Sequence, residues 1–446
     1  MTATPDNLES INWDRYITAV DSCQTLTAEG RISKVVGLIA EGHGPGIGVG
    51  SACNILNEEG VEILSEVVGF KDNKIMLMPY GEVRGISPGC KITLVRKQPY
   101  IPVGDGYLGR VVNGMGEPID GLGPITSSVY YPLYGQIVNP MKRGLITEVA
   151  DVGIAAVNTL ITIGKGQRMA IMSGSGVGKS VLMGMMARHT SADVSIIALI
   201  GERGREVKDF VERNLGEEGL KKSVVVAATS DVSPLIRMRG AYLATTLGEY
   251  FRDCGMDVLL VMDSITRFAM SSREVGLAAG EPPTVKGYTP SFFARLPKLL
   301  ERAGNIEGKG SITAIYTVLV EADDMNDPVG DAVRSIVDGH IVLSRELANR
   351  GHYPAIDVLA SVSRVMREIV APDHLELSQK AKQVLATYRD AEDLISIGAY
   401  VNGSDPKIDY AKEMIDKINT FLRQDIHEAV SFEAGVNKLK ELFTRP

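Results

Sequence analysis

The chain has 446 residues, of which 44% are hydrophobic and 23% are charged, and its formal net charge is −8. This composition is that of a globular protein long enough for two or three domains, and the acidic balance argues against nonspecific binding to nucleic acid. The four cysteines (Cys23, Cys53, Cys90 and Cys254) are scattered and form no Cys-x-x-Cys pair. They predict free thiols in a reducing cytosol, and they argue against a zinc site or a disulfide framework.

The N-terminal residues 1–25 predict a short amphipathic helix and no secretory signal. Asp6 and Glu9 stand where a signal peptide would be basic, and no run in the chain approaches the roughly 20 apolar residues that span a bilayer. We therefore expect a cytoplasmic protein that reaches a membrane only through partners. Apolar residues between Trp13 and Val20 share one helical face. This face either packs on its own domain or docks a partner, and the pattern leaves both open.

Residues 26–97 predict a small all-β domain, either a barrel or a sandwich. Short apolar stretches alternate with Gly, Pro and Asn turns such as Gly44–Gly46 and Ser87–Gly89. The stretches are Ser33–Ala40, Val61–Phe70, Lys74–Met78 and Lys91–Val95. A connection rich in Gly and Pro follows over residues 98–145.

The next part of the chain, to about residue 369, predicts a mostly parallel sheet covered by helices on both faces. Apolar, β-branched runs alternate there with helical stretches. The runs are Arg168–Met172, Val194–Ile200, Val224–Ala228, Val258–Met262, Ile312–Val320 and Ile341–Leu343. Residues 370–446 predict a helical domain, with helix formers concentrated in Leu375–Ala391, Leu394–Tyr400 and Asp409–Ala429.

A glycine-rich segment at the end of the first of these strands predicts a phosphate-binding loop. Residues 173–180 read Ser-Gly-Ser-Gly-Val-Gly-Lys-Ser before a helical stretch, so phosphates would lie at a helix N-terminus. Lys179 can reach the β- and γ-phosphates, and the Ser180 hydroxyl can ligate Mg²⁺. A glycine-rich turn with no ligand is the alternative, and Ser173 replaces the usual first glycine. The predicted contacts are Gly174, Ser175, Gly176, Val177, Gly178, Lys179, Ser180 and Val181.

Two acidic residues follow later strands of the predicted sheet. Glu202 comes after Val194–Ile200, where a carboxylate could orient and polarise an attacking water. Asp263 ends the run that starts at Val258, which is the position of a carboxylate that reaches a Mg²⁺ shell. Alone, Glu202 could be a solvated loop residue and Asp263 a helix cap. Beside a phosphate loop, the two together predict nucleoside triphosphate hydrolysis.

Several segments together resemble the catalytic subunits of rotary ATPases. They are Gly201–Val207, Asp263–Phe268, Tyr353–Asp357 and Ser361–Arg364. The stretches Gly276–Pro283 and Val318–Pro328 are most similar to the ATPases of flagellar and related type III protein export. The resemblance covers roughly residues 27–440. It implies an α/β fold with a RecA-like P-loop core and a parallel sheet, preceded by a small β-barrel domain and followed by a C-terminal helical domain.

The resemblance also implies roles for single residues, with ATP and Mg²⁺ as cofactors. Glu202 would activate water, and Arg203 would hold the neighbourhood of the γ-phosphate. Tyr353 would stack on the adenine ring, and Arg364 would be an arginine finger that enters the site of the adjacent subunit. Without the resemblance, Tyr353 could be merely packed and Arg364 could be an ordinary surface arginine.

Partners follow from the same resemblance. It implies a homohexamer, and a coiled-coil central stalk protein that contacts a projecting loop at Glu274–Pro283. It further implies a negative regulator on the N-terminal helix, export chaperone–substrate complexes on the C-terminal domain, and peripheral association with the export gate at the inner membrane.

The function expected is ATP hydrolysis that energises flagellar protein export, by a ring with shared active sites. The ATPase of a virulence type III injectisome and the catalytic subunit of a rotary ATP synthase are alternatives with the same chemistry. A ring-shaped RNA translocase is another, but residues 26–97 lack an aromatic and basic stretch, so we expect no nucleic acid partner. Glu202 argues against a nucleotide-binding structural subunit, because such subunits lack the activating carboxylate.

Overall fold

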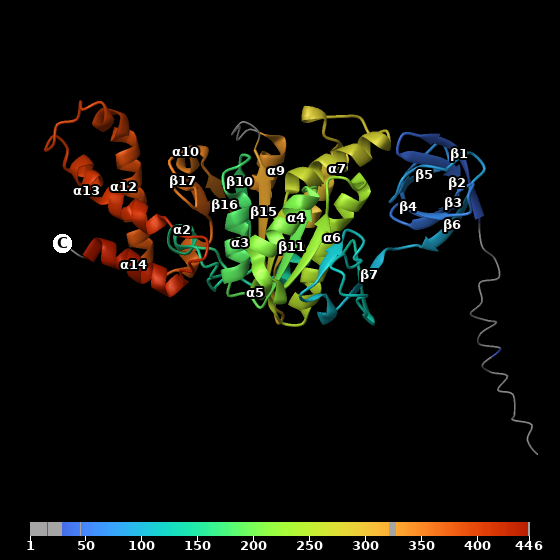
Figure 1. The fold of residues 1–446 in the computed structure, drawn as a ribbon, viewed down its shortest axis with the longest axis horizontal. Coiled ribbons are helices and arrows are strands. Elements are labelled where there is room, and N and C mark those ends of the chain that lie inside the picture. Colours follow the sequence, from blue (N-terminus) through green and yellow to red (C-terminus); the bar gives the residue numbers. More distant parts are fainter. Residues whose placement is uncertain (1–15, 17–28, 45, 321–326, 445–446) are drawn as a thin grey trace, which may run out of the picture. The chain divides into compact units, whose positions relative to one another are not determined.

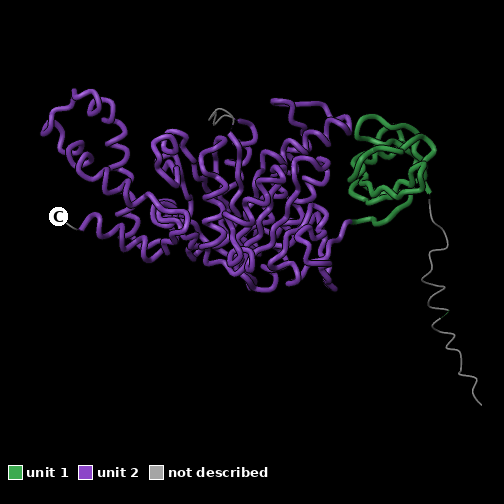
Figure 2. The backbone as a smooth tube through the Cα atoms, in the orientation of Figure 1, with its two compact units in different colours: residues 1–98 green, residues 99–446 purple. Residues whose placement is uncertain are grey.

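The structure is a computed structural model, and it describes residues 16, 29–44, 46–320 and 327–444. The chain forms two compact units, Met1–Gln98 and Pro99–Pro446 (Figures 1 and 2). Apart from Tyr16, the predicted N-terminal helix lies outside the described residues. The division of the second unit into an ATPase domain at 98–369 and a helical domain at 370–446 stays a prediction.

The first unit contains a closed six-stranded barrel. Its strand order is β1-β2-β5-β4-β3-β6. The strands are β1 (Glu29–Val36), β2 (Ile39–His43), β3 (Ala52–Leu56), β4 (Glu62–Lys71), β5 (Lys74–Pro79) and β6 (Lys91–Arg96). The prediction of one strand over Ser33–Ala40 is wrong, because Gly37 takes a left-handed φ of 56° and turns the chain between β1 and β2. Strand β3 was not predicted.

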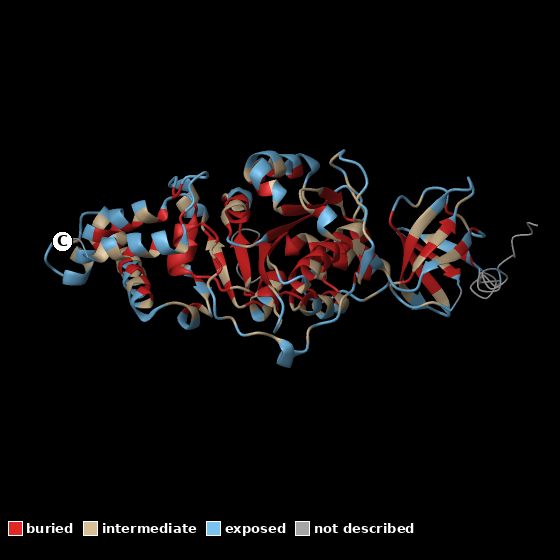
Figure 3. Cartoon of the chain, turned by 90° about the horizontal axis from the view of Figure 1, so that it is seen from below, coloured by how far each residue is buried: buried red, intermediate tan, exposed pale blue. Residues whose placement is uncertain are grey.

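The second unit is built on a nine-stranded sheet in the order β17-β16-β10-β15-β13-β11-β12-β8, with β14 paired to β15 off this path. Along this path, all strands from β16 at one side to β8 at the other run parallel to one another. Strands β17 and β14 are antiparallel to their neighbours. The strands are β8 (Val111–Asn113), β10 (Arg168–Ser173), β11 (Val194–Ile200), β12 (Ser223–Ala228), β13 (Asp257–Asp263), β14 (Gly304–Asn305), β15 (Ser311–Leu319), β16 (Gly339–Leu343) and β17 (Ile356–Ser363). The central strands are buried on both faces, which explains their continuous apolar runs (Figure 3).

The connection predicted over residues 98–145 has structure of its own. Strands β7 (Tyr100–Val103) and β9 (Val129–Pro132) form an antiparallel pair, while β8 joins the edge of the main sheet. The connection is fixed to the core by Arg302, whose guanidinium donates to Leu133 O at 2.9 Å and pairs with Glu249 at 2.6 Å. Both side chains of this pair are buried.

Helices cover the sheet and connect its strands (Figure 1). They are α2 (Ala155–Leu160), α3 (Lys179–His189), α4 (Gly204–Asp209), α5 (Gly216–Lys221), α6 (Pro234–Asp253), α7 (Ile265–Ala278), α8 (Pro290–Leu300), α9 (Pro328–Ile336), α10 (Arg345–Asn349) and α11 (Met366–Ile369), with a π-helical turn at Phe210–Leu215. The prediction of a loop over Glu274–Pro283 is wrong for its first half, since α7 runs through Ala278. Glu274 is held there by an ion pair with Arg237 on α6, at 2.9 Å.

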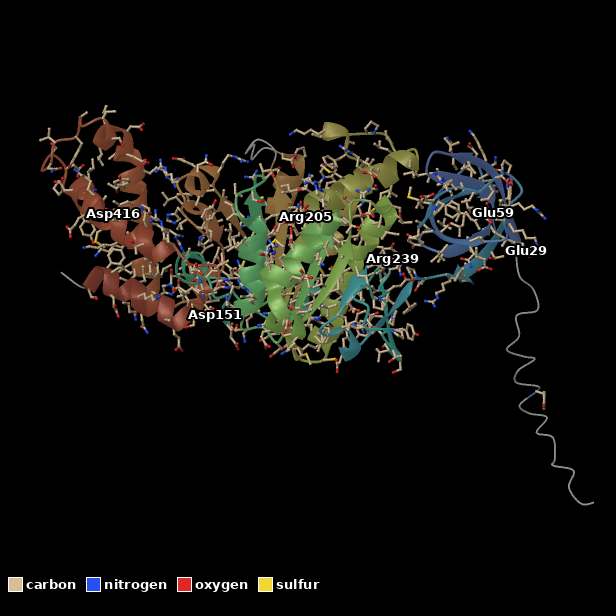
Figure 4. All side chains as sticks on the ribbon, viewed as in Figure 1. Glu29, Glu59, Asp151, Arg205, Arg239 and Asp416 are labelled. Atoms are coloured by element: carbon tan, nitrogen blue, oxygen red, sulfur yellow. The ribbon has the colours of Figure 1, made fainter. Side chains whose placement is uncertain are left out.

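The C-terminal part is helical, as predicted, with α12 (Pro372–Ser396), α13 (Pro406–Leu422) and α14 (Phe432–Thr444). Its contacts with the sheet region include Asp151, labelled in Figure 4, whose carboxylate accepts a hydrogen bond from Phe432 N at 2.7 Å. Gln424 donates to Gly153 O at 2.7 Å and accepts from Ala155 N at 2.8 Å. In the part of the chain that the structure describes, no helix is both long and apolar enough to cross a bilayer.

Candidate active site

The phosphate loop lies at the carboxyl end of β10 and leads directly into α3. Gly176 and Gly178 have φ angles of 79° and 91°, a region that side-chain-bearing residues rarely adopt. Gly178 is the N-cap of α3, so the unpaired N–H groups of the first helical turn lie beside the loop. The backbone is therefore shaped to surround an anion. Val177 takes part only through its backbone, because its side chain is 1% exposed and packs in the core.

Three predicted residues from separate segments meet at this loop. The Lys179 ammonium forms a short ion pair with Asp263 Oδ1 and lies 3.9 Å from Glu202 Oε1. Asp263 also accepts a hydrogen bond from Thr317 Oγ1, on β15, at 2.7 Å. The meeting follows from the strand order, because the carboxyl ends of β10, β15, β13 and β11 are neighbours at one edge of the sheet.

The environment of Glu202 suits a catalytic base. Its side chain is 14% exposed, and burial, with the nearby Asp263 charge, raises its pKa to about 7 against the opposing effect of Lys179. A hydrogen bond with Glu206 adds to the increase. Oε1 of Glu202 is buried without a hydrogen-bond partner among the described residues. A carboxylate with a free oxygen and a near-neutral pKa can accept a proton from water at physiological pH.

A cavity of about 740 Å³ opens over these residues. Cationic side chains line it, and Lys179, Arg203, Arg267 and Arg345 outnumber the acidic Glu202 and Glu206. This charge balance suits a polyanion such as a triphosphate. Cavity-lining residues that the sequence reasoning did not single out are Glu206, Ser230, Thr266, Arg267, Met270, Leu319, Val320 and Arg345. Glu206, Thr266, Arg267, Leu319 and Val320 lie in the segments that carried the resemblance to rotary and export ATPases, so the sequence held a signal for them.

The residues predicted to hold Mg²⁺ fit that ion in chemistry. Ser180 lines the cavity, and Asp263 is 3% exposed, with its carboxylate paired to Lys179. Among the described residues, no group of three or more His, Cys, Asp or Glu side chains could hold a metal. Sites that bind Mg²⁺ with a nucleotide need only one or two protein oxygens, because phosphates and waters supply the others.

Tyr353 lies beside the phosphate loop and does not line the cavity over Lys179. A Cβ added to Gly178 would lie 3.5 Å from the Tyr353 ring, and the ring is 46% exposed. Its carbonyl accepts a hydrogen bond from Gln424 N at 3.0 Å, which ties this segment to the C-terminal helices. The exposed ring is thus available for stacking on a flat ligand next to the loop.

Arg364 and the phosphate loop of the same chain lie at opposite ends of the strands. Strand β17 is antiparallel to β16, so Ser363 pairs with Gly339 at the start of β16, whereas Leu343 pairs with Ser173 at the phosphate-loop end. Arg364 is exposed, and its guanidinium makes no hydrogen bond or ion pair with the described residues. The structure therefore does not bring Arg364 to the site formed by Lys179, Glu202 and Asp263 of the same chain.

Comparisons with known proteins agree with this geometry. The chain matches the ATP synthase alpha/beta family in its nucleotide-binding domain over residues 153–363 and its β-barrel domain over 32–95. Residues 370–441 match the T3SS EscN ATPase C-terminal domain. The chain is 50% identical over 431 residues to the flagellum-specific ATP synthase of Pseudomonas aeruginosa, with 96% of each chain covered.

Solved structures extend the similarity to the fold. The assembled ATPase EscN of enteropathogenic E. coli superposes with a TM-score of 0.88 at 43% identity, covering 93% of this chain and 99% of EscN. EscN in complex with its central stalk EscO gives a TM-score of 0.86 at 42% identity, with the same coverage. These matches confirm the predicted fold class and the predicted ATPase activity. The chain belongs to the ATP synthase alpha/beta family, within its group of flagellum-specific and type III secretion ATPases.

Proposed function

We propose that this ATPase hydrolyses Mg·ATP to energise protein export, in a six-membered ring whose active sites are shared between neighbouring subunits. The observation that carries the proposal is the convergence of Lys179, Glu202 and Asp263 under one cationic cavity, with Arg364 at the far edge of the sheet. One chain thus supplies the loop, the base and the metal-linked carboxylate. The charge that would neutralise the transition state comes from another copy.

Each residue has a defined task in this reaction. Lys179 leaves Asp263 to bind the β- and γ-phosphates, and Glu202 orients the attacking water and accepts its proton. Arg203 stabilises the γ-phosphate from the cavity wall. Bound Mg²⁺, held by Ser180 and Asp263, would neutralise charge on the β- and γ-phosphate oxygens. Tyr353 stacks on the adenine.

Arg364 of the adjacent subunit completes the site in this proposal. Arginine fingers supplied in this way accelerate phosphoryl transfer by about 10³–10⁵. The ring is supported by the assembled state of EscN, which is similar to this chain over 93% of its length. Hydrolysis should then depend on assembly, and a dilute subunit should be nearly inactive.

Export is favoured over synthesis by the C-terminal helices. Residues 370–441 match the T3SS EscN ATPase C-terminal domain. We further propose that a coiled-coil stalk contacts Glu274–Pro283, in line with the complex that EscN forms with EscO. The C-terminal helices would receive chaperone–substrate complexes, and the N-terminal residues a negative regulator. The ring would work in the cytoplasm beside the membrane export gate.

The test is complementation between two inactive variants. Lys179→Ala removes the phosphate contact but keeps Arg364, whereas Arg364→Ala does the reverse. In mixed rings, a site is complete where the loop of an Arg364→Ala subunit faces the arginine of a Lys179→Ala subunit. A random equal mixture should regain about one quarter of wild-type phosphate release, since each site needs two independent choices. If mixtures stay as inactive as their components, the shared-site ring is wrong.

A further inference from the structure

The C-terminal end of β17, which Arg364 directly follows, is held by two residues from other segments of the sheet. The Gln167 Nε2 group donates to Ser363 Oγ at 3.1 Å and to Asp338 O at 3.0 Å. The same Asp338 carbonyl accepts a hydrogen bond from Arg364 N at 3.0 Å. These contacts form a Gln167–Asp338 clamp on the hydroxyl of Ser363 and the backbone N–H of Arg364.

Both members of the clamp are themselves fixed. Gln167 is fully buried, and its Oε1 accepts a hydrogen bond from Gly164 N at 2.9 Å, which sets the orientation of its amide. The Asp338 carboxylate accepts hydrogen bonds from Arg168 N and Nε, each at 3.1 Å. Gln167 is buried and Asp338 is half-buried. Their hydrogen bonds favour one geometry at this end of the strand, because leaving the buried Gln167 amide unpaired costs free energy.

The Arg364 side chain contrasts with its backbone. The backbone is clamped, but the guanidinium is exposed and has no hydrogen bond or ion pair with the described residues. An arginine in this state is suited to reach a group outside its own chain. Its effect on a neighbour's phosphate would depend on placement, since an error of about 1 Å can cost about 10²-fold in rate.

We propose that Gln167 is a positioning residue: it holds Arg364 in place, so that the Arg364 side chain acts on the active site of the adjacent subunit. The inference rests on the proposed function, in which Arg364 works in trans. Gln167 directly precedes the six-residue strand β10, whose other end opens into the phosphate loop about 20 Å away. Strand β10 therefore leads into the phosphate loop of its own chain at one end. At its other end lies the clamp on Arg364, the arginine proposed to act in the adjacent subunit.

The test uses the complementation assay with Gln167→Met placed in either partner. As arginine donor, Lys179→Ala/Gln167→Met should restore an Arg364→Ala subunit at least about tenfold less well than Lys179→Ala does. As acceptor, Gln167→Met/Arg364→Ala should be restored by Lys179→Ala to within about twofold of the Arg364→Ala value. The defect should thus follow the subunit that supplies the arginine.

A matched control separates positioning from general damage to the core. Asn158 is also a buried amide, 1% exposed, and donates to Asp151 Oδ1 at 2.7 Å and to Val430 O at 2.9 Å, away from Arg364. Lys179→Ala/Asn158→Leu should therefore act as an arginine donor as well as Lys179→Ala. Ring assembly of each mixture is measured in parallel by native mass spectrometry.

The outcomes separate the two proposals. If Lys179→Ala and Arg364→Ala complement each other but Gln167→Met weakens donor and acceptor equally, or only the acceptor, the positioning role is wrong and the shared site stands. If the parent variants do not complement, the shared site itself fails. Should Gln167→Met not assemble, Ser363→Ala removes the hydroxyl that Gln167 holds, and the same loss confined to the donor is expected. An unchanged Ser363→Ala donor would then overturn the inference.

Discussion

The raised pKa of Glu202 predicts a steep acid limb in ATP hydrolysis. A base with a pKa of about 7 is about one-tenth deprotonated at pH 6 and about nine-tenths at pH 8, so kcat/KM should rise about tenfold between them. At the ordinary value of 4.5, the same interval would change the rate by less than about a tenth. Steady-state phosphate release at low Mg·ATP concentration measures this quantity, because kcat/KM reports the free enzyme.

Glu206 supplies the control for this pH profile. It raises the Glu202 pKa by a hydrogen bond and by its charge, so Glu206→Gln should move the acid limb to lower pH. Titration of ATP itself affects both proteins equally and cannot produce a difference between their curves. A flat profile between about pH 6 and pH 8, or superimposed curves for the two proteins, would refute the assignment of Glu202 as the base.

The same pKa predicts how Glu202 affects stability. The folded protein binds this proton more tightly than the unfolded chain, so stability falls as pH rises from 4.5 to about 7, and the cost is complete above that. The shift corresponds to at most about 3 kcal/mol. Glu202→Gln should therefore unfold at higher temperature than wild type at about pH 8, with no gain near pH 4.5, while hydrolysis falls by about 10²–10⁴. Unchanged hydrolysis in this variant would exclude Glu202 from catalysis.

Three further predictions concern other parts of the second unit. Arg302→Met leaves Glu249 buried without its partner and should destabilise the unit by about 3–5 kcal/mol in urea unfolding, with partial recovery in Arg302→Met/Glu249→Leu. Burial lowers the pKa of His374, whose Nε2–H donates to Thr159 O at 2.7 Å. Stability should thus be complete above the unfolded pKa of about 6.5 and decline below it, and His374→Gln should reduce that decline in pH-dependent thermal melts. Tyr353→Ala should raise KM for ATP about tenfold with little change in kcat, and Tyr353→Phe should restore it.

The sequence was sufficient to predict those parts of the site and of the sheet that a local pattern of residues determines. Glu202 comes two residues after the end of β11, and Asp263 is the last residue of β13. Parallel strands end at one edge of a sheet, so the meeting of both residues with Lys179 could be expected. Continuous apolar runs likewise indicated the central strands, because these are buried on both faces.

Other features depend on contacts between distant segments. Nothing local to Thr317 shows that its hydroxyl will reach Asp263 from the neighbouring strand. Arg345 enters the cavity wall only because the segment between β16 and β17 places it there. The end of α7 was misjudged for a related reason, because the glycines of this segment suggested a loop. Gly276 instead lies inside α7 and packs tightly against Thr289, which is outside that helix. The clamp on Arg364 joins residues 167, 338 and 363, a grouping that only the folded sheet produces.

The ion pair between Lys179 and Asp263 also bears on which anions the site retains. Any anion that binds Lys179 must first displace the Asp263 carboxylate. Because Asp263 is part of the protein, its effective concentration beside Lys179 stays constant. A single phosphate offers too few contacts to outcompete it, whereas a triphosphate gains the loop amides and the arginines of the cavity at the same time. After cleavage, a return of Lys179 to Asp263 would oppose rebinding of the released phosphate. We therefore expect the pair to favour long polyphosphates over single phosphates and to limit inhibition by the product.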